Sequence, residues 1–403
     1  MSPQSPGLAG IRDWLITPDV PFSNAEELLG ALAERLVEAG TPLWRLSTSI
    51  PTLHPEIYVR NVLWARGQGI QSSLRQHSIV DSPSYRGSPV QAIRQGQGPL
   101  RCRGWVPDER SRFRTVAELF DQGATDYWIG PVRLGSRMGE GLDAFGGLTF
   151  LSAATAKPGG FDEAQLECLE SLGPVLGLQL AAESARFATQ SLLRVYLGQN
   201  ASERVLAGAF KRGTGQLIRA ALWYADMRGF SELSDRTTPR EVVQLLDAYF
   251  ERVGGAIEDA GGEILKFIGD AILAVFPVEG DPAGACQKAL AAARSALTSL
   301  DGLNAQRGSS LKMGIALHLG EVMYGNIGSH QRLDFTVIGA AVNEAARVES
   351  LCKKLEAPLL ITGAFADAMG REGLRSLGTH VLQGVSGERE VFTLPFSPPT
   401  PGP

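Results

Sequence analysis

The sequence predicts an α+β protein with more than one domain, and three observations support this class. The chain has 403 residues, enough for two or three domains that each bury a core. Residues 264–276 contain two apolar runs on either side of Gly269 and Asp270, which is the pattern of a buried β-hairpin with a tight turn. A helical pattern with strong capping signals precedes that hairpin, and further strands and helices alternate along the chain.

The composition is that of a soluble globular protein, because 44% of the residues are hydrophobic and 20% are charged. The formal net charge is -5 and the isoelectric point is about 5.7. No strongly basic face is therefore available for nucleic acid or for an anionic membrane. We expect neither as a partner.

The cysteines and the amino-terminal sequence indicate the cellular compartment of the protein. Four cysteines are widely scattered and form no Cys-x-x-Cys pair, which is typical of a reducing compartment rather than of disulfides or a zinc site. The amino terminus lacks the order of basic and apolar segments found in a signal peptide, and no window has about 18 uninterrupted apolar residues. These features predict a cytoplasmic protein.

The first elements in chain order are a lead-in, a helix and a strand. Residues 1–22 are rich in Pro and Gly and are expected to be loosely ordered. Ser23 and Glu26 have the spacing of a capping box, which predicts a helix that ends at Gly40. Alternating apolar and polar residues at 44–50 predict a half-buried strand.

The segment 51–126 is predicted to consist mainly of loops. Arginine with aromatic residues can line an anionic or cyclic-nucleotide pocket, but scattered arginines more often form a solvated face. The second interpretation is favoured here, and no ligand is assigned. The residues concerned are Arg60, Arg66, Arg75, Arg86, Arg94, Arg101 and Arg103, with Trp64 and Trp105 between them.

Two strands and a long helix follow. Residues 127–134 and 147–153 have strand-like patterns, and a helical pattern begins at Phe161 and continues to about residue 195. The part of this helix at 178–195 has an apolar seam that fits either a partner helix or the surface of its own domain. Small and polar residues at 196–215 are typical of a connector.

The candidate metal-binding residues lie in the second half of the chain. An apolar strand at 217–225 ends in Asp226, and Thr238 and Glu241 form a capping box for the helix before the hairpin. Strand, helix and hairpin form a crossover unit that can bring Asp226 and Asp270 side by side. Two adjacent carboxylates attract a divalent metal ion.

The hairpin itself has one unusual feature. Lys266 lies in an otherwise apolar strand and Asp270 lies at the turn, so a cation and a carboxylate occupy one rigid element. The pair fits a ligand site, and it equally fits a polar turn beside a lysine that extends from the edge of the core. These residues alone leave both alternatives open.

The remaining elements complete a sheet. Asn343 and Arg347 are four residues apart in a predicted helix, so they lie on one stripe of its surface. Such pairs are more often simple surface contacts than parts of a site. The predicted elements are helices at 283–300 and 341–354, strands at 311–319, 322–327 and 333–339, further strands within 358–394, and a Pro-rich tail at 396–403.

Five motifs occur in an order and spacing that resemble a class III nucleotidyl cyclase domain. Each motif alone is weak, whereas the ordered set is specific and extends over nearly all of 217–394. The resemblance implies an α+β catalytic domain with a ferredoxin-like βαββαβ core at 216–395. The motifs are Ala-Asp-Met-Arg-Gly-Phe at 225–230, Lys-Phe-Ile-Gly-Asp at 266–270, Gly-Asn-Ile-Gly-Ser at 325–329, Thr-Val-Ile-Gly at 336–339 and Val-Asn-Glu-Ala-Ala-Arg at 342–347.

The resemblance also implies an activity and its cofactors. Asp226 and Asp270, with the main-chain carbonyl of Met227, would hold two Mg2+ or Mn2+ ions per site. Phosphoryl transfer needs positive charge on the transferring group, which such ions supply. The implied activity is that of an adenylyl cyclase, which converts ATP to 3′,5′-cyclic AMP and pyrophosphate.

Four further residues receive roles from the same resemblance. Lys266 and Thr336 would contact the adenine ring. Asn343 would orient the ribose, and Arg347 would neutralise charge at the α-phosphate with a permanent cation and fixed donors. A lysine donates to the ring nitrogens of adenine, whereas guanine needs a carboxylate acceptor, so ATP is favoured over GTP.

Two other activities stay open. One alternative is a guanylyl cyclase, and the other is a catalytically silent module that senses nucleotides or dimerises. The complete set of site residues argues against the silent module. Most family members have Asp where this chain has Thr336, and the Thr-bearing subclass is often bicarbonate-responsive, so bicarbonate is a candidate regulator.

The resemblance further implies a homodimer, because in this family the metal carboxylates and the Asn/Arg helix meet across a dimer interface. One chain here carries both halves, which gives two equivalent sites. Two departures from the family pattern stand out. Ala340 replaces a common Asp, and the segment 383–389 lacks a lysine that contacts the terminal phosphates in some members, with Arg389 as the candidate substitute.

The order of elements at 23–185 resembles a GAF-type sensor domain, especially the segment 157–162 that leads into the long helix. This resemblance implies an α/β sensor domain that regulates the cyclase through a helical connector at 186–215. Residues 1–22 would be a flexible lead-in and 396–403 a tail. No ligand motif accompanies the resemblance, so the expected small-molecule regulator is unidentified.

Overall fold

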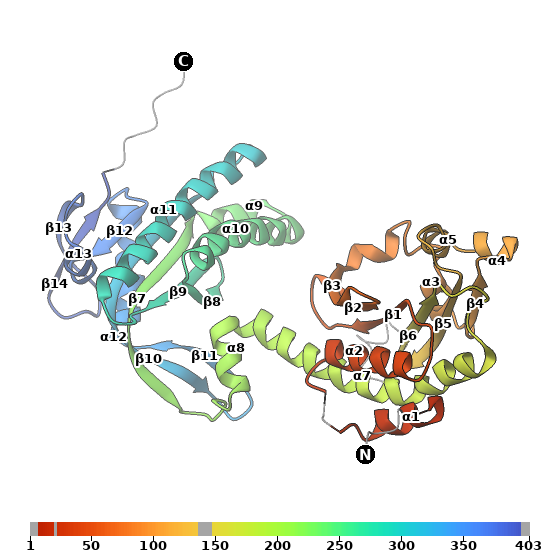
Figure 1. Ribbon diagram of the computed structural model, residues 1–403. Coiled ribbons are helices and arrows are strands. Elements are labelled where there is room, and N and C mark those ends of the chain that lie inside the picture. Colours follow the sequence, from red (N-terminus) through yellow and green to blue (C-terminus); the bar gives the residue numbers. More distant parts are fainter. Residues whose placement is uncertain (1–6, 20–21, 136–146, 396–403) are drawn as a thin grey trace. The chain divides into compact units, whose positions relative to one another are not determined.

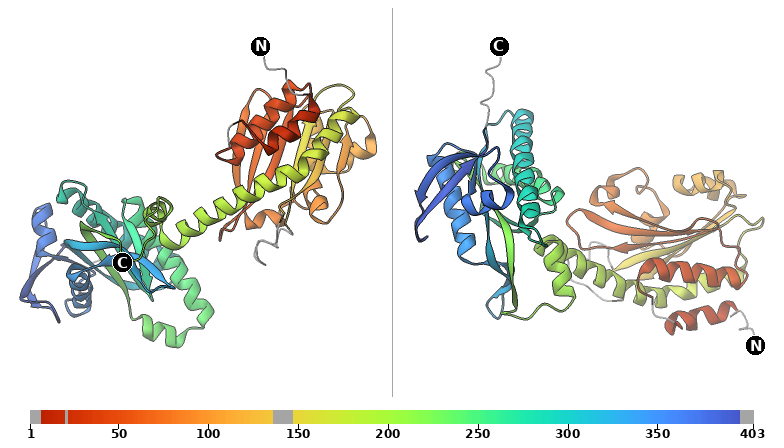
Figure 2. Two further views of the ribbon diagram at one scale, coloured as in Figure 1. Left: turned by 90° about the horizontal axis from the view of Figure 1, so that it is seen from below. Right: turned by 60° about the vertical axis from the view of Figure 1, so that its left-hand side comes forward.

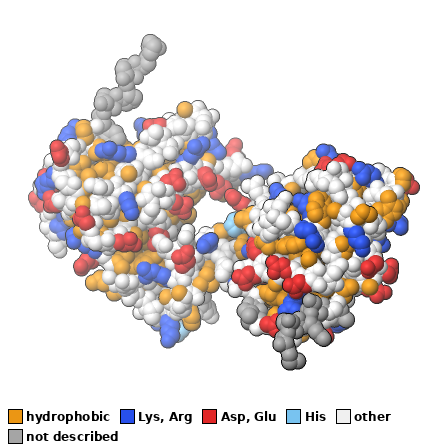
Figure 3. Space-filling view, viewed as in Figure 1, with side chains coloured by type: hydrophobic (Ala, Val, Ile, Leu, Met, Phe, Trp, Pro, Cys, Tyr) orange, Lys and Arg blue, Asp and Glu red, His pale blue; other side chains and the backbone are white. Residues whose placement is uncertain are grey.

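The computed structural model describes residues 7–19, 22–135 and 147–395 (Figure 1). It divides into two compact units, at Val195 and Tyr196, and each is described by itself. The predicted tail at 396–403 lies outside the described residues. Within the described ranges, no helix has the length and apolar character needed to cross a membrane. On the face shown in Figure 3, acidic and basic side chains are interspersed over each unit.

The amino-terminal unit combines one antiparallel sheet with helices on both faces. Its strands are β1 (Arg45–Pro51), β2 (Ile57–Ala65), β3 (Gly69–Gln76), β4 (Leu100–Arg103), β5 (Asp126–Arg133) and β6 (Leu148–Thr155). Its helices are α1 (Leu8–Ile16), α2 (Ala25–Glu38), the 3-10 helix η1 (His77–Asp81), α3 (Pro89–Arg94), α4 (Pro107–Ser111), α5 (Arg114–Asp121) and α7 (Glu163–Leu197).

Strand pairing and burial explain how this unit is layered. The strand order is β3-β2-β1-β6-β5-β4. Successive side chains of a strand point to opposite faces, so each face of the sheet buries its own apolar cluster. Helices α2 and α7 cover one face, with α1 packed outside them (Figure 2), and α3 and α5 pack on the other.

Three predictions for this unit are corrected. The lead-in at 1–22 contains α1, whose Ile11 and Leu15 are fully buried in the core. The segment 51–126 is not mainly loop, because it forms three strands and several helices. Strand β3 lies at the edge of the sheet and is largely exposed, so its sequence shows no regular alternation of apolar and polar residues. Helix α2 is capped by Asn24 instead of Ser23, and the Asn24 side chain accepts from the backbone N–H of Glu27.

The predicted boundaries between the units also change. Helix α7 runs without interruption past residue 185, where the sensor domain was predicted to end. Within the predicted connector, α8 (Gln199–Leu206) belongs to the carboxyl-terminal unit, where Ala201 is fully buried. The Nδ2 of Asn200 donates to the carboxylate of Glu263 at 3.2 Å, and Tyr324 donates to the same carboxylate at 2.7 Å. The GAF resemblance of the first unit stays a prediction.

The carboxyl-terminal unit is an eight-stranded sheet between helices. Its strands are β7 (Gly215–Arg228), β8 (Glu263–Ile268), β9 (Ala271–Pro277), β10 (Lys312–Gly328), β11 (Leu333–Ile338), β12 (Leu359–Thr362), β13 (Arg375–Val381) and β14 (Glu388–Thr393). Its helices, besides α8, are α9 (Phe230–Arg236), α10 (Pro239–Asp259), α11 (Pro282–Arg307), α12 (Ala340–Lys354) and α13 (Gly363–Met369).

The core of this sheet has the predicted ferredoxin-like arrangement. In chain order it is β7-α10-β8-β9-α11-β10, and in space the strands lie in the order β10-β7-β9-β8 with antiparallel neighbours. The capping box of Thr238 and Glu241 at the start of α10 is present. One difference concerns β10, which is a single long strand where two shorter strands were predicted.

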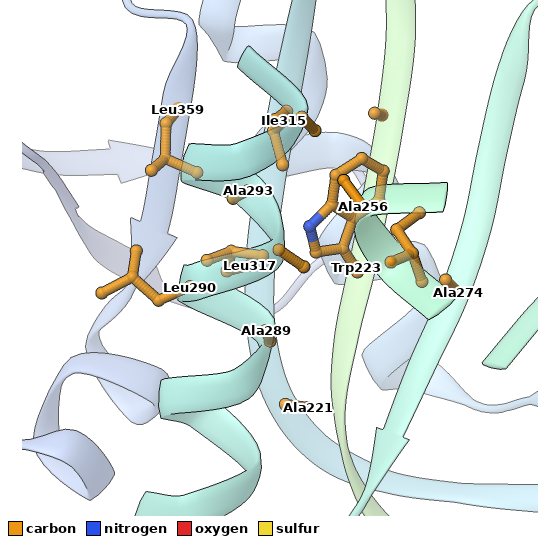
Figure 4. Close-up of a cluster of buried hydrophobic side chains, with 14 of the residues drawn as sticks. Ala221, Trp223, Ala256, Ala274, Ala289, Leu290, Ala293, Ile315, Leu317 and Leu359 are labelled. Carbon is orange, nitrogen blue, oxygen red and sulfur yellow. The ribbon is translucent and has the colours of Figure 1, made fainter. Parts of the chain in front are cut away.

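The two faces of β7 serve different helices. Ala221, Trp223 and Ala225 face the cluster formed with α10, α11 and α13, whereas Ala220 and Leu222 face the cluster formed with α8 and α12. Figure 4 shows the alanines of α11 on the side of that helix that faces the strands carrying Trp223 and Leu317. Small side chains let the helix approach the sheet closely, so this interface has no spare volume.

This close packing predicts the effect of enlarging one alanine. Ala293 of α11 is fully buried, so Ala293→Leu should lower the free energy of unfolding by about 1–3 kcal/mol through overpacking. Ala291 of the same helix is exposed, and Ala291→Leu should change it by less than about 0.5 kcal/mol. Urea titration of both variants measures the difference, and equal effects would contradict the described orientation of α11.

Candidate active site

The pairing of two antiparallel strands brings Asp226 and Asp270 together. Asp226 lies near the end of β7, and Asp270 lies in the turn before β9. Ala225 pairs with Ile272 across these strands, so the two aspartates lie at the same end of the pair, where one carboxyl hydrogen-bonds the other. Gly269 makes the turn possible because its φ of 66° is in the left-handed region. The predicted juxtaposition of the two aspartates is therefore present.

This end of the sheet carries an excess of negative charge. The pKa of Asp226 is raised to about 6, mainly by burial and then by the hydrogen bond and the charge of Asp270. Burial also raises the pKa of Glu349 to about 7, with the charges of Asp226 and Asp270 acting in the same direction and Arg228 opposing them. A cation bound beside these carboxylates would stabilise their ionised form and lower their pKa values.

The donor set fits a hard divalent ion such as Mg2+ or Mn2+, which prefers carboxylate, carbonyl and water oxygens. The side chain of Met227 is buried in the core, so only its main chain is available to a ligand, as its predicted role requires. Among the residues that the structure describes, no group of three or more His, Cys, Asp or Glu forms a metal site. Two carboxylates would therefore need substrate, water or main-chain oxygens to complete the coordination.

Lys266 and Thr336 lie in a second polar region of the same unit. The Nζ of Lys266 forms an ion pair with Asp334 of β11 at 2.5 Å, and both side chains are 41% exposed. That hydrogen bond lowers the pKa of Asp334. Thr336 follows Asp334 by two residues on the same strand, so the two side chains project from the same face. Asp334 was not among the predicted site residues, because its pairing with Lys266 arises only where β11 and β8 meet in the fold.

Helix α12 presents different residues on opposite sides. Asn343 and Arg347 are both exposed, on the stripe that their spacing predicted. Glu349 lies on the inner side, because a Cβ added at Gly314 would overlap its carboxylate, and Gly314 pairs with Asp226 across β10 and β7. Two residues along a helix correspond to a rotation of about 200°. Arg347 therefore points away from the carboxylates of its own chain.

The structure shows where the two departures from the family pattern, Ala340 and Arg389, lie. Ala340 is the exposed first residue of α12. The Nε of Arg389 donates to Glu344 of α12 at 2.9 Å, and its Nη1 donates to the carbonyls of Ser386 and Glu388. Arg389 is thus tied within its own chain, and its role as a substitute for the phosphate-binding lysine stays a prediction.

Glu349 was also missed by the sequence analysis. No local signal marks it, since it is one of several polar residues on an amphipathic helix. Its position beside Asp226 follows only from the packing of α12 against β7 and β10. Sequence reasoning found the residues that share a motif and missed those that the tertiary fold adds.

Part of the chain is similar to known proteins. Residues 216–363 match the adenylate and guanylate cyclase catalytic domain family. The chain is 37% identical over 158 residues to an adenylate cyclase of Anabaena cylindrica, covering 37% of this chain and 30% of the relative. It is 34% identical over 151 residues to a terminal-differentiation specific adenylate cyclase of Dictyostelium discoideum, covering 37% of this chain and 7% of the relative.

Among solved structures, a bacterial light-regulated adenylyl cyclase has 27% sequence identity and a TM-score of 0.46, covering 55% of this chain and 64% of that chain. The chain spans less than a third of the length of both curated relatives. The family match lies wholly within the carboxyl-terminal unit. The carboxyl-terminal unit therefore contains the region that is similar to adenylate and guanylate cyclase catalytic domains.

The raised pKa of Asp226 predicts that the free energy of unfolding of the metal-free protein falls as pH rises. Between the ordinary pKa of 3.8 and the folded-state pKa of about 6, the folded state keeps a proton that the unfolded state has lost. The stabilisation from this proton is complete below pH 3.8 and is lost as pH rises to about 6. We expect Asp226→Asn to gain stability relative to the unchanged chain across this window. Urea titrations with chelator at several pH values measure the gap, and parallel curves would contradict the prediction.

Proposed function

We propose that the chain is a cytoplasmic adenylyl cyclase that works as a homodimer and converts ATP to 3′,5′-cyclic AMP and pyrophosphate. The observation that carries this proposal is the Asp226–Asp270 pair at the end of β7 and β9, inside the region that matches the cyclase family. The four buried free cysteines support a reducing compartment.

Asp226, Asp270 and the main-chain carbonyl of Met227 would hold two Mg2+ or Mn2+ ions. When bound, these ions polarise the triphosphate and ease ionisation of the 3′-hydroxyl. The protein's own contribution is a pair of partly buried carboxylates. Burial, followed by the hydrogen bond and charge of Asp270, raises the pKa of Asp226, and a bound divalent cation would offset this cost of ionisation. The backbone N–H of Met227 opposes this rise by hydrogen-bonding the Asp226 carboxylate.

Lys266 and Thr336 would select the base. The ammonium of Lys266 can donate to adenine ring nitrogens but cannot accept from the N1–H and amino group of guanine. Asp334 holds Lys266 by an ion pair at 2.5 Å, which fixes the direction of this donor before the base arrives. ATP is therefore the proposed substrate, and GTP is the alternative.

The arrangement of α12 supports a site shared between two chains. Asn343 and Arg347 are exposed and directed away from the carboxylates of the same chain, and Arg347 forms no ion pair with any residue in the described ranges. They can act on a substrate held at Asp226 and Asp270 only if a second copy presents them. Asn343 would then orient the ribose and Arg347 would stabilise charge at the α-phosphate.

We further propose that the amino-terminal unit regulates this activity. Since α8 is part of the carboxyl-terminal unit, a fragment that isolates the cyclase should begin at Tyr196 and not near Gly215. Comparing its activity with that of the whole chain tests regulation. Bicarbonate stays a candidate regulator because of Thr336, and the same assay with and without bicarbonate at fixed pH decides this point.

The catalytic proposal predicts a metal-dependent conversion of ATP. With Mg2+ or Mn2+ the purified chain should form cyclic AMP from ATP in preference to cyclic GMP from GTP, as measured by product analysis in competition. Asp270→Asn should lower kcat/KM at least about 100-fold by removing a metal ligand. It should also abolish the rise in Tm that Mn2+ gives the unchanged chain.

Two controls separate the possible outcomes. Asp281→Asn alters a carboxylate that only caps α11, so it should leave both the activity and the Mn2+ effect on Tm intact. Faster turnover of GTP than of ATP would favour the guanylyl cyclase alternative. If neither nucleotide is converted while Mn2+ still binds, the chain is a silent nucleotide-sensing or dimerisation module.

Site sharing predicts complementation between two inactive variants. Asp270→Ala and Arg347→Ala should each be inactive alone. A mixed dimer would have one intact site, because one chain keeps the carboxylates and the other keeps the arginine. Random mixing makes about half of the dimers mixed, so about a quarter of the original activity should return. An equimolar mixture that stays inactive after subunit exchange would show that the sites are not shared.

A further inference from the structure

An ion pair joins the helix that carries Asn343 and Arg347 to the strand β14. The Nε of Arg389 donates to Oε1 of Glu344 on α12 at 2.9 Å. The side chain of Glu344 is only 12% exposed, so this carboxylate is largely desolvated and depends on a partner. Arg389 therefore acts on the same helix as the candidate catalytic residues.

Arg389 is the only Lys or Arg within ion-pairing distance of this carboxylate among the residues that the structure describes. The other neighbour is His318 of β10, whose Nδ1 lies 3.7 Å from Oε1 of Glu344 and 3.0 Å from Oγ1 of Thr362. Burial lowers the pKa of His318, so its imidazole is neutral at neutral pH. The charge of Glu344 is therefore offset by Arg389 alone.

The main chain holds Arg389 in place. Its Nη1 donates to the carbonyl oxygens of Ser386 at 3.0 Å and Glu388 at 3.3 Å. The donors of a guanidinium are fixed in one plane, so these bonds also fix the direction of the Nε that contacts Glu344. Arg389 thus keeps the carboxylate of Glu344 on the side of α12 that faces β10 and β14.

The position of Glu344 matters because it precedes Arg347 by three residues. Side chains three or four residues apart are neighbours on a helix, and an acid and an arginine at this spacing attract each other. The other positions at this spacing from Arg347 hold Asn343, Ser350 and Leu351, so Glu344 is the only acid among them. Nevertheless, Arg347 forms no ion pair with any residue in the described part of the chain.

Pairing with Arg389 explains why Arg347 stays unpaired. A carboxylate that is neutralised and turned to one side attracts a second guanidinium only weakly. Without Arg389, Glu344 would be a largely buried charge with no partner, and the exposed Arg347 would be the cation beside it on the helix. An arginine captured in this way would no longer be available to a phosphate.

We propose that Arg389 is a positioning residue, which keeps Arg347 available to the substrate by holding Glu344 away from it. This inference rests on the proposed function, in which Arg347 stabilises charge at the α-phosphate. It gives Arg389 a role different from the contact with the terminal phosphates that the family resemblance suggested.

Chemical labelling of Arg347 tests the inference without an activity assay. Phenylglyoxal reacts with neutral guanidine groups, whereas an ion pair favours the charged form. Arg389→Gln in the whole chain should therefore slow the labelling of Arg347 at least about threefold, as measured by mass spectrometry of the peptide that contains it. Adding Glu344→Gln should restore the rate, because glutamine keeps the shape of the side chain and loses its charge. An unchanged rate in Arg389→Gln, or no recovery in the double variant, would overturn the inference.

Steady-state kinetics measure the effect on catalysis. Arg389→Gln should lower kcat for cyclic AMP at least about tenfold and change KM for ATP less than about threefold, because the lost interaction belongs to the transition state. In a chain that already carries Glu344→Gln, the same change should lower kcat less than about threefold, since the two residues act as a coupled pair. A rise in KM for ATP of equal size in both backgrounds would show that Arg389 binds phosphate instead, which contradicts the inference.

Arg371 offers a matched control near the same strand. Its Nη1 pairs with Glu390 of β14 at 3.0 Å and its Nε with Asp367 of α13 at 2.6 Å, so both partners lie outside α12. Arg371→Gln should change neither the labelling of Arg347 nor kcat, and an effect equal to that of Arg389→Gln would overturn the inference. If the unchanged chain makes no cyclic nucleotide, the proposed function fails, and the labelling of Arg347 still decides the role of Arg389.

Discussion

The antiparallel pairing of β7 with β9 is the constraint on which the carboxyl-terminal unit depends. It forces two carboxylates to the same end of the sheet, where they repel one another in a partly buried setting. The same two strands carry Trp223 and Ile272 into the core, so burial of apolar surface offsets the local repulsion. Packing of the core therefore keeps the carboxylates of Asp226 and Asp270 close together, whereas in a flexible chain they would move apart.

Much of this unit could be predicted because its signals are local. The turn at Gly269, the capping box of Thr238 and the periodicity of α10 all act within a few residues. Asp334 and Glu349 were missed because their positions depend on contacts between distant strands and helices. Local rules place the elements, whereas the packing of those elements adds residues to a site.

The amino-terminal unit was harder to predict for a related reason. Strand β3 is an edge strand with little apolar surface, and α1 is short, so neither gives a clear periodic pattern. The arginines between them look alike in the sequence, although Arg101 neutralises a fully buried carboxylate while Arg45 faces a cavity. Distinguishing these arginines requires knowing where the acids are in space, which composition does not show.

The opposite orientations of Arg347 and Glu349 on α12 have a consequence for the living cell. If the two halves of a site come from different copies, the concentration of active dimer follows the square of the chain's concentration when copies are scarce and rises only in proportion to it when they are abundant. The amount of protein would then act as a threshold on the signal. Expression level, as well as any ligand, would decide whether second messenger is made.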